Sequence, residues 1–343
     1  MTFDAATTYD VLFPHFQERI RRHEPLARHS AFGVGGAADV WISLESRKEL
    51  FDLVSLCSEK HWPLLIVGNG TNVLFADAGV RGIVARMALS TYSLEDEGDG
   101  TALLVADAGV SWPLLLHELA PRGWGGLEFG VGIPGTLGGA VISNAGAHNH
   151  ELGQVLEWIE VLDARGCNTE DEHDIGIPLV RRYEHDELDL SYRHSRFREQ
   201  RYIRFDEHGH YIFPTRSMIE PAEIVMQLGI RLHRAKPEQL QTTIAEHKRY
   251  RKQTEPPPHR AGTVFKDPAG HDVDTLITQA GMKGKIHGQA QISPHHTNYI
   301  VNLGGAQAVD IATLIMETRQ RVLEKFGVAL ELDVEFRGEW EKY

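Results

Sequence analysis

Cysteine is scarce in this sequence: only Cys57 and Cys167 occur among 343 residues. Two thiols cannot build a disulfide framework or a cysteine-based metal site, so we expect both to be unpaired. No apolar run approaches the roughly 20 residues that a membrane-spanning helix needs. The N-terminus has neither the basic start nor the apolar core of a signal peptide. We therefore expect a cytoplasmic protein without membrane insertion.

Positive charge is also in short supply, with 35 Lys and Arg against 48 Asp and Glu and a net charge of −13. This balance argues against nucleic acid as a partner, because such partners are bound through an excess of basic residues. Anionic small molecules remain compatible with it, since local groups hold them. The 19 histidines are scattered and form no H-E-x-x-H pattern, so we expect exposed histidines and no metal site.

Glycine, by contrast, is concentrated in two loops. An apolar segment at 64–67 runs into Gly-Asn-Gly-Thr-Asn at 68–72, and residues 127–146 contain six glycines and one proline. Glycine leaves backbone N–H groups bare enough to approach a ligand closely. Two such loops favour a ligand with two phosphates, and thus a cofactor-binding enzyme, over two purely structural turns.

The second loop also contains Gly130-Val-Gly-Ile-Pro-Gly135, which fits the G-x-G-x-x-G fingerprint of dinucleotide-binding folds. That fingerprint should open a helix. Here Pro134 lies inside the motif, and Gly138 and Gly139 follow, each costing a helix about 1 kcal/mol relative to alanine. We therefore reject a Rossmann fold.

Hydrophobic periodicity predicts alternating helices and strands. Helices are expected at 9–24, 46–60, 112–119, 237–253 and 309–326, and strands at 38–44, 64–67, 82–86, 102–106, 155–163, 224–233 and 328–336. In the last strand, Glu331, Asp333 and Glu335 would share one face, either as a site or as a solvated acidic surface. Segments 169–187 and 202–221 lack periodicity and are predicted to be a surface excursion and an insertion.

The helix at 237–253 ends in a basic run, residues 248–252, before three prolines at 256–258. These cations could hold a phosphate. We favour a structural reading, because a cation in the last turn of a helix contributes about 0.3–1 kcal/mol without any ligand.

Several ordered motifs, taken together, resemble the UDP-N-acetylenolpyruvoylglucosamine reductase (MurB) family, over nearly the whole chain from about residue 28 to 338. The motifs are Phe32-Gly-Val-Gly-Gly36, the two glycine loops, Tyr192-Arg-His-Ser-Arg-Phe197, Gly262-Thr-Val-Phe-Lys-Asp-Pro268, Ala280-Gly-Met-Lys-Gly284 and residues 291–302. The chain lacks the family's longer tyrosine-bearing substrate loop, so it resembles the shorter subtype.

The resemblance implies an α+β architecture: a two-subdomain FAD-binding fold of the PCMH or vanillyl-alcohol-oxidase type, followed by a C-terminal α+β substrate domain. The implied parts are an N-terminal helical segment (1–27), FAD subdomains at 28–90 and 91–235, and a substrate domain at 236–343. FAD and NADPH are the implied cofactors. The implied reaction reduces UDP-N-acetylglucosamine enolpyruvate to UDP-N-acetylmuramate in peptidoglycan synthesis, with the UDP-sugar and NADPH as small-molecule partners.

The resemblance also implies catalytic roles for Arg193, Thr263 and Asp333. Arg193 matches the family's active-site arginine, whose planar guanidinium suits a carboxylate or an enolate. Thr263 stands where the family usually has a proton-donating serine, and Asp333 where it usually has a glutamate. Each exchange keeps the functional group and alters its reach, and a misplacement of about 1 Å can lower a rate about 10²-fold.

Binding residues follow from the same motifs. FAD contacts are predicted at Gly68, Asn69, Gly70, Thr71, Asn72, Gly132, Ile133, Pro134, Gly135, Thr136, Gly138, Gly139, Asn144, Ala145 and Gly146. Substrate contacts are predicted at Tyr192, Lys266, Asp267, Lys283, Gln291 and Asn298, with structural roles about equally expected. Asp267 stands where the family often has asparagine.

Two alternatives stay open. The chain could be an FAD-dependent oxidase of the same superfamily, in which His148 or His150, near the second glycine loop, carries a covalent flavin. It could also be a homologue that binds FAD or a UDP-sugar but is catalytically impaired by the exchanges at Thr263 and Asp333.

Overall fold

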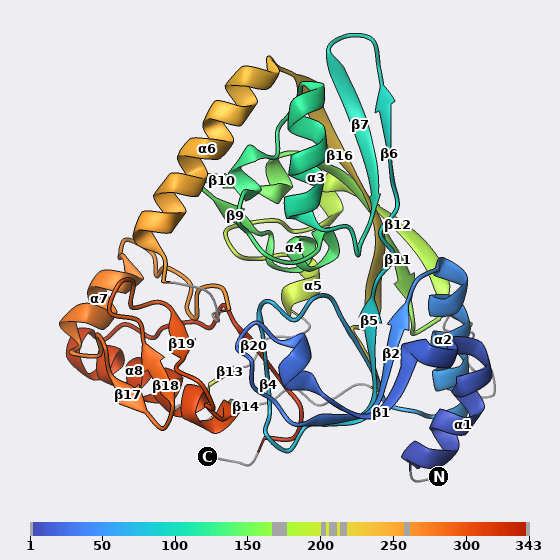
Figure 1. Ribbon diagram of the computed structural model, residues 1–343, viewed down its shortest axis with the longest axis horizontal. Coiled ribbons are helices and arrows are strands. Elements are labelled where there is room, and N and C mark those ends of the chain that lie inside the picture. The colour runs from blue at the N-terminus through green and yellow to red at the C-terminus, as the bar shows by residue number, and fades with distance from the viewer. Residues whose placement is uncertain are drawn as a thin grey trace.

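The computed structural model describes residues 3–166, 177–199, 204–205, 211–212, 218–256 and 261–340. Two sheets form the larger part of the molecule, and a smaller α+β unit lies beside them (Figure 1). Helix α6 (Pro237–Thr254) runs from the second sheet's part of the chain to the smaller unit. Within the described part of the chain, no helix has the length and the hydropathy to cross a bilayer.

The first sheet has the strand order β1-β2-β5-β3-β15. Its strands are β1 (Ile20–Pro25), β2 (Ala37–Leu44), β5 (Val80–Met87), β3 (Leu64–Val67) and β15 (Ile219–Glu220). Helix α2 (Arg47–Lys60) begins at Ser46, whose Oγ accepts the Glu49 N–H at 3.2 Å. The helix places Leu50, Val54 and the unpaired, buried Cys57 in the core. Cys167 lies outside the described residues.

The helix predicted at 9–24 is shorter than expected. Helix α1 covers Ala5–Phe16 and ends where Gln17 adopts a positive φ of 48°. Residues from Ile20 onward form β1, antiparallel to β2, and Ile20 lies opposite Ile42. Leu12, Phe16 and Ile20 follow one another at intervals of four residues, the spacing of one helix face, and all three are buried, but Ile20 reaches the core from a strand. The predicted N-terminal segment 1–27 thus contributes to the first sheet.

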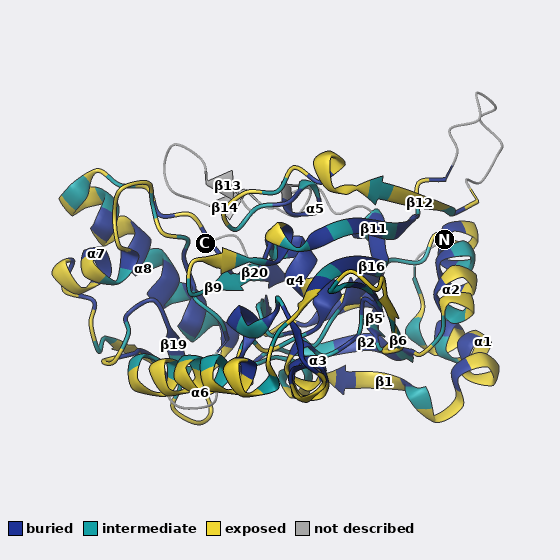
Figure 2. Ribbon diagram, turned by 90° about the horizontal axis from the view of Figure 1, so that it is seen from above, coloured by how far each residue is buried: buried dark blue, intermediate teal, exposed yellow. Residues whose placement is uncertain are grey.

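The second sheet is antiparallel, with the order β12-β11-β16-β7-β6, and β8 also pairs with β16. Its strands are β6 (Tyr92–Asp96), β7 (Thr101–Asp107), β8 (Trp124–Gly125), β11 (Leu156–Asp163), β12 (Leu179–Glu184) and β16 (Glu223–Arg234). The sheet is accompanied by α3 (Trp112–Leu119), α4 (Leu137–Ser143), α5 (Arg196–Glu199) and the short pair β9 (Gly146–Ala147) and β10 (His150–Glu151). Figure 2 shows β11 and β16 buried and α6 mostly exposed.

Both segments predicted to lack regular structure contain strands. Strand β12 lies within 169–187 and forms the exposed edge of the second sheet, so residues 179–184 are at the surface but are regular; residues 169–176 lie outside the described residues. Within 202–221, β13 (Arg204–Phe205) pairs with β14 (Tyr211–Ile212), and β15 joins the first sheet in parallel with β3. Apolar alternation over so few residues is too short to be detected in the sequence.

The smaller unit contains α7 (Val273–Gln279), the strands β17 (Ile286–His287), β18 (Ala290–Ile292) and β19 (Ile300–Asn302), and helix α8 (Ala308–Phe326). Strand β20 (Glu335–Arg337) leaves this unit and pairs in parallel with β4 (Val73–Phe75). Phe32, Val34 and Leu74, from the N-terminal part of the chain, belong to the same hydrophobic core as α8. Single 3₁₀ turns complete the described elements: η1 (Gln17–Arg19), η2 (Leu26–His29), η3 (Ala120–Arg122), η4 (Glu128–Gly130), η5 (Leu152–Gln154) and η6 (His185–Glu187).

The strand predicted at 328–336 is largely replaced by irregular chain. Only Glu335–Arg337 forms a strand, and Leu332 makes a single bridge to Phe265. The N–H groups of Asp333 and Val334 both reach the Val264 carbonyl, at 2.8 and 3.3 Å, which bends the chain between the bridge and the strand. The predicted shared face of Glu331, Asp333 and Glu335 is therefore wrong: Asp333 is buried, whereas the Glu331 side chain is 61% exposed.

Helix α6 contacts the second sheet's subdomain through two stacked imidazoles. The His148 and His247 ring centroids are 3.8 Å apart with planes 9° apart, and His148 Nε2 is buried without a hydrogen-bond partner among the described residues. Partial burial, then the neighbouring His247 and Arg251, lower the pKa of His148 below its ordinary value, against the smaller opposite effect of Glu255. His150 adds to the lowering of this pKa, Tyr250 packs edge-on, and His247 Nδ1 lies 3.3 Å from the Glu128 carbonyl.

We expect stability to depend on pH through this pair. Because the pKa of His148 is lower in the folded than in the unfolded chain, the unfolded chain binds more protons below about pH 6.5, and the free energy of unfolding falls as pH decreases from about 7 to about 5. Urea melts over this range should show a smaller fall for His148→Gln than for the wild type. His117→Gln, on the exposed face of α3, is the matched control and should leave the dependence unchanged.

Candidate active site

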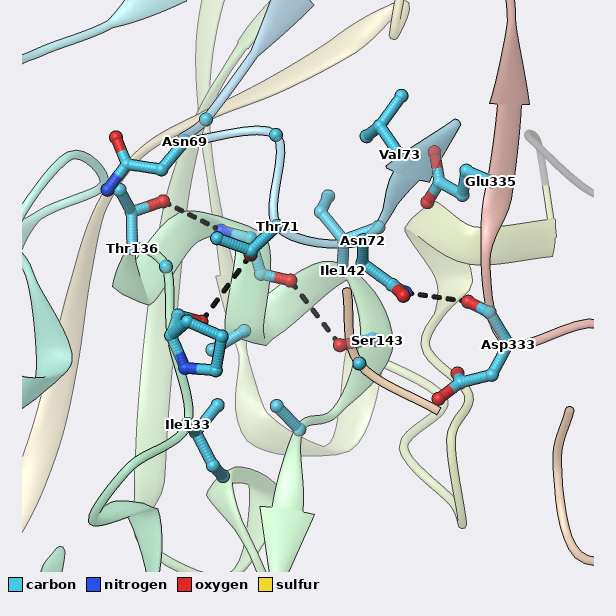
Figure 3. A pocket seen from close by; sticks show the side chains of 18 of the residues that line it. Asn69, Thr71, Asn72, Val73, Ile133, Thr136, Ile142, Ser143, Asp333 and Glu335 are labelled. Carbon is cyan, nitrogen blue, oxygen red and sulfur yellow. Dashed lines mark hydrogen bonds between the residues drawn. The ribbon is translucent and has the colours of Figure 1, made fainter. Parts of the chain in front are cut away.

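One cavity lies where the two glycine loops meet the smaller unit. It is lined by residues 66–73, which include the first glycine loop, by 133–136, parts of α4, Ala145 and Gly146 from the second loop, and by Gly262, Thr263, Tyr299, Asp333, Glu335 and Arg337 from the C-terminal part. Arg193 and Arg251 complete the lining. Thus segments separated by more than 200 residues in the sequence form a single site (Figure 3).

The first glycine loop presents bare backbone. Among the described residues, no hydrogen-bond partner is found for the N–H groups of Asn69, Gly70 and Thr71, all three of which line the cavity. Gly70 has φ +61° and lies so close to the His29 carbonyl that a Cβ there would be 1.8 Å from its oxygen. The loop therefore needs glycine at position 70, and its free donors can bind an anion.

The second loop contacts the first. A Cβ on Gly68 would lie 2.9 Å from Thr136 Oγ1, and one on Gly135 would lie 2.8 Å from Thr71 Oγ1. Thr136 then caps α4, accepting the Gly139 N–H at 3.3 Å. A seven-residue helix thus does run through Gly138 and Gly139, contrary to our expectation. Gly138 is needed because a Cβ would lie 2.7 Å from the Ala108 Cβ.

Three of the predicted FAD contacts lie outside the cavity lining: Gly132, Gly138 and Asn144. Asn144 has φ 43° at the end of α4 and uses its amide within the protein, donating to Glu151 and the Ser191 carbonyl and accepting from Gly153. The other twelve line the cavity.

The predicted catalytic residues lie together in this cavity, beside the first glycine loop. Thr263 Oγ1 donates to Asp333 Oδ2 at 2.9 Å, and Arg193 Nε is 3.7 Å from the same oxygen. Asn72 Nδ2 donates to the Asp333 backbone carbonyl at 2.6 Å, the contact drawn in Figure 3. A carboxylate, a hydroxyl and a guanidinium therefore converge next to the first glycine loop.

Arg193 has an unusual backbone. Its φ of +52° places it in the left-handed region, which a non-glycine residue adopts at a cost of about 1–2 kcal/mol. Its side chain is 21% exposed and its guanidinium carbon lies 5.7 Å from the Tyr192 ring centroid. Retained strain of this kind is typical of functional sites.

None of the six predicted substrate contacts lines the cavity. Tyr192 Oη donates to Asp267 Oδ2 at 3.1 Å, and burial, followed by the Asp267 charge, raises the pKa of Tyr192. Lys266 Nζ is 3.4 Å from Glu331, Lys283 is exposed, and Gln291 donates to the Gly284 carbonyl at 3.1 Å. Asn298 is buried, and its amide makes two hydrogen bonds with the Phe265 backbone. It therefore stabilises the loop that carries Thr263, two residues before Phe265.

Three arginines at or next to the site were not among the predicted site residues, although the basic run that contains Arg251 was considered as a phosphate site. Arg251, from the basic run of α6, lines the cavity with its side chain 14% exposed and paired to Glu255. Arg337 lines it from β20 and pairs with Glu220 and Glu335. Arg198 is buried behind Asp333. Arg251 carried a signal in its basic run; Arg198 and Arg337 had none beyond their residue type.

The comparisons with known proteins agree with this arrangement. Residues 253–337 match the family model of the UDP-N-acetylenolpyruvoylglucosamine reductase C-terminal domain, and residues 38–169 match an FAD binding domain. A UDP-N-acetylenolpyruvoylglucosamine reductase of Rubrobacter xylanophilus is 38% identical over 92% of this chain and 94% of its own length. One from Clostridium botulinum is 34% identical over 92% of each.

A solved structure gives the same result. The crystal structure of UDP-N-acetylenolpyruvylglucosamine reductase (MurB) from Thermus caldophilus has a TM-score of 0.70 and 32% identity, covering 92% of this chain and 99% of that one. The α+β fold with an FAD-binding part and a C-terminal substrate domain is thereby confirmed, as is FAD as the cofactor. The chain belongs to the UDP-N-acetylenolpyruvoylglucosamine reductase (MurB) family.

Proposed function

We propose that this protein reduces UDP-N-acetylglucosamine enolpyruvate to UDP-N-acetylmuramate with electrons from NADPH, a step of peptidoglycan synthesis in the cytoplasm. Family membership supports the reaction class. The observation that carries the proposal is the meeting of Arg193, Thr263 and Asp333 in the same cavity as the two glycine loops. Small molecules, the UDP-sugar and NADPH, are the proposed partners.

The cavity fits FAD. The free N–H groups of residues 69–71 suit the flavin diphosphate, and the close approach at Gly68, Gly70 and Gly135 leaves no room for side chains there. Ile66, Val73 and Ile133 add apolar surface, and Arg251 adds a cation. When bound, the flavin supplies hydride transfer between NADPH and the substrate.

Hydride addition to an enolpyruvyl group forms a bond at the β-carbon and leaves an enolate, which must be stabilised and then protonated at the α-carbon. In the proposed mechanism, the Arg193 guanidinium faces the substrate carboxylate and the developing enolate charge. The Thr263 hydroxyl donates the proton, and Asp333 orients that hydroxyl through the 2.9 Å hydrogen bond. Arg193 and Arg198 offset the negative charge that is left on Thr263 and Asp333.

Substrate-contact roles for Tyr192, Lys266, Asp267, Lys283, Gln291 and Asn298 remain proposals. Tyr192 and Asp267 are the strongest, because they join the Arg193 loop to the Thr263 loop across two parts of the chain. Asn298 is proposed as a positioning residue, since its amide is used by the Phe265 backbone.

The proposal is tested by anaerobic stopped-flow measurements on the purified holoprotein. NADPH should bleach the oxidised flavin band, and the enolpyruvyl substrate should restore it with formation of UDP-N-acetylmuramate. A flavin that stays reduced in the presence of this substrate would reject the reaction.

The alternatives predict other results. A covalent-flavin oxidase would retain flavin in acid-precipitated protein, yet His148 and His150 do not line the cavity and Cys57 is buried in the core. A homologue impaired at Thr263 and Asp333 would be bleached by NADPH but would not be reoxidised by the enolpyruvyl substrate until Thr263→Ser and Asp333→Glu together restored turnover.

Adding one methyl group at Gly70 should prevent flavin binding. Gly70→Ala combines left-handed strain of about 1–2 kcal/mol with a clash against the His29 carbonyl, so the protein should be colourless and less stable by about 2–4 kcal/mol. Bound flavin and urea melts are the readouts. Gly98→Ala is the matched control, because Gly98 also has a positive φ, +80°, but has open space around it. Equal loss of flavin in both variants would contradict the close-approach argument.

A further inference from the structure

Arg198 is a buried arginine without an assigned role. Its side chain is 3% exposed, and Nη2 lies 3.1 Å from Asp333 Oδ1 in an ion pair and also donates to the Asp333 backbone carbonyl. It is carried by α5, which is fixed against α4 because Ser195 Oγ donates to the Ile142 carbonyl at 2.7 Å. The fully buried Phe197 anchors the same turn.

The contacts of Asp333 are divided between two arginines. Oδ2 accepts the Thr263 hydroxyl and faces Arg193 at 3.7 Å, whereas Oδ1 faces Arg198 at 3.1 Å. Among the described residues, these two arginines form the ion pairs of Asp333. The two guanidinium groups thus face different oxygens of the carboxylate, and Arg198 faces the oxygen that Thr263 does not bond.

Burying Arg198 is costly. A guanidinium removed from water loses several kcal/mol of hydration, which one ion pair offsets only in part. Its Nη1 is buried with no hydrogen-bond partner among the described residues. A buried ion pair is also weak evidence for a stabilising role, so stability alone is a weak reason for an arginine here.

We propose that Arg198 is a positioning residue for substrate protonation. It holds the carboxylate of Asp333 within hydrogen-bond reach of Thr263 Oγ1. The aspartate side chain is one methylene shorter than that of the glutamate that the family usually has at this position. Asn72 assists from the first glycine loop by holding the Asp333 carbonyl. This inference rests on the proposed function and adds a residue that acts without touching substrate.

The two half-reactions separate this role from a structural one. NADPH-dependent flavin reduction needs no proton from Thr263, whereas reoxidation by the enolpyruvyl substrate does. Arg198→Met should therefore slow reoxidation about 10²-fold, the effect of a displacement of about 1 Å, and leave flavin reduction within about 2-fold. Arg198→Lys keeps the charge but not both contacts to Asp333. Its flavin should be reoxidised at least about tenfold faster than that of Arg198→Met.

A double-mutant cycle tests whether Arg198 acts through Asp333. Arg198→Lys should slow reoxidation in the wild-type background but change it less than about 2-fold in Asp333→Asn, because coupled residues are not additive. This comparison remains decisive even when Arg198→Met does not fold. Arg196→Met is the control: Arg196 lies in the same helix, pairs with buried Glu223, and should affect stability without changing either half-reaction.

Three results would overturn the inference: equal slowing of both half-reactions, an Arg198→Lys effect of the same size in Asp333→Asn, or unchanged reoxidation in Arg198→Met. Failure of the proposed function itself is recognised separately, because wild-type protein would then not be reoxidised by the substrate at all.

Discussion

Replacing Arg193 with asparagine should lower kcat for substrate reduction about 10³-fold, because the developing enolate loses its cation at close range. The same change should not destabilise the fold. Asparagine adopts the left-handed region more readily than arginine does, so the strain at φ +52° is relieved while one 3.7 Å ion pair is lost. Steady-state kinetics and urea melts measure the two effects on the same sample.

The control for this variant is Arg182→Asn. Arg182 is an exposed arginine of β12 that pairs with Glu184, so its replacement should leave kcat unchanged. An Arg193→Asn enzyme that keeps kcat within about tenfold of the wild type would contradict the proposed role, since loss of one preorganised charge donor costs about 10²–10³-fold.

Thr263→Ala should slow flavin reoxidation by the enolpyruvyl substrate about 10²–10⁴-fold, the usual contribution of a positioned acid or base. Flavin reduction by NADPH should be unaffected, because no group is protonated by Thr263 in that step. Thr263→Ser restores the hydroxyl without the methyl group and should stay within about tenfold of the wild type. Single-turnover traces for each half-reaction are the measurement.

The contrary outcome is specific. If Thr263→Ala and Thr263→Ser lose the same amount of activity, the methyl group rather than the hydroxyl matters, and the proton comes from elsewhere. If neither loses activity, the hydrogen bond to Asp333 is structural only.

Much of the fold could be predicted from local signals. The capping serine at Ser46 and the apolar face of the following helix are encoded within fifteen residues, and α2 lies where it was predicted. The glycine loops were recognisable because clustered glycines weaken helices and strands and are favoured where the backbone must turn sharply or approach a ligand. The structure brings both loops to one cavity. Local patterns suffice when the contacts that decide the structure are local.

The rest depended on contacts between distant segments. Nothing near Ile20 in the sequence shows that it pairs with Ile42 instead of extending α1. Likewise, the apolar alternation around Asp333 predicts a regular strand, whereas a shared bond to the distant Val264 carbonyl bends the chain and buries this carboxylate. In the sequence, Arg198 cannot be distinguished from the nearby Arg193 and Arg196, and only the structure shows that it lies beside Asp333.

The pairing of β20 with β4 limits how the molecule can open. Residues 335–337 pair with β4, the strand that directly follows the first glycine loop. Glu335 lies opposite Val73, the residue after Asn72. The C-terminal unit is therefore joined to β4 by main-chain hydrogen bonds, and the side chain of Leu74 in β4 also packs in the core of that unit. An opening motion that admits a bulky nucleotide sugar is thus expected to move the C-terminal unit together with β4, relative to the second sheet.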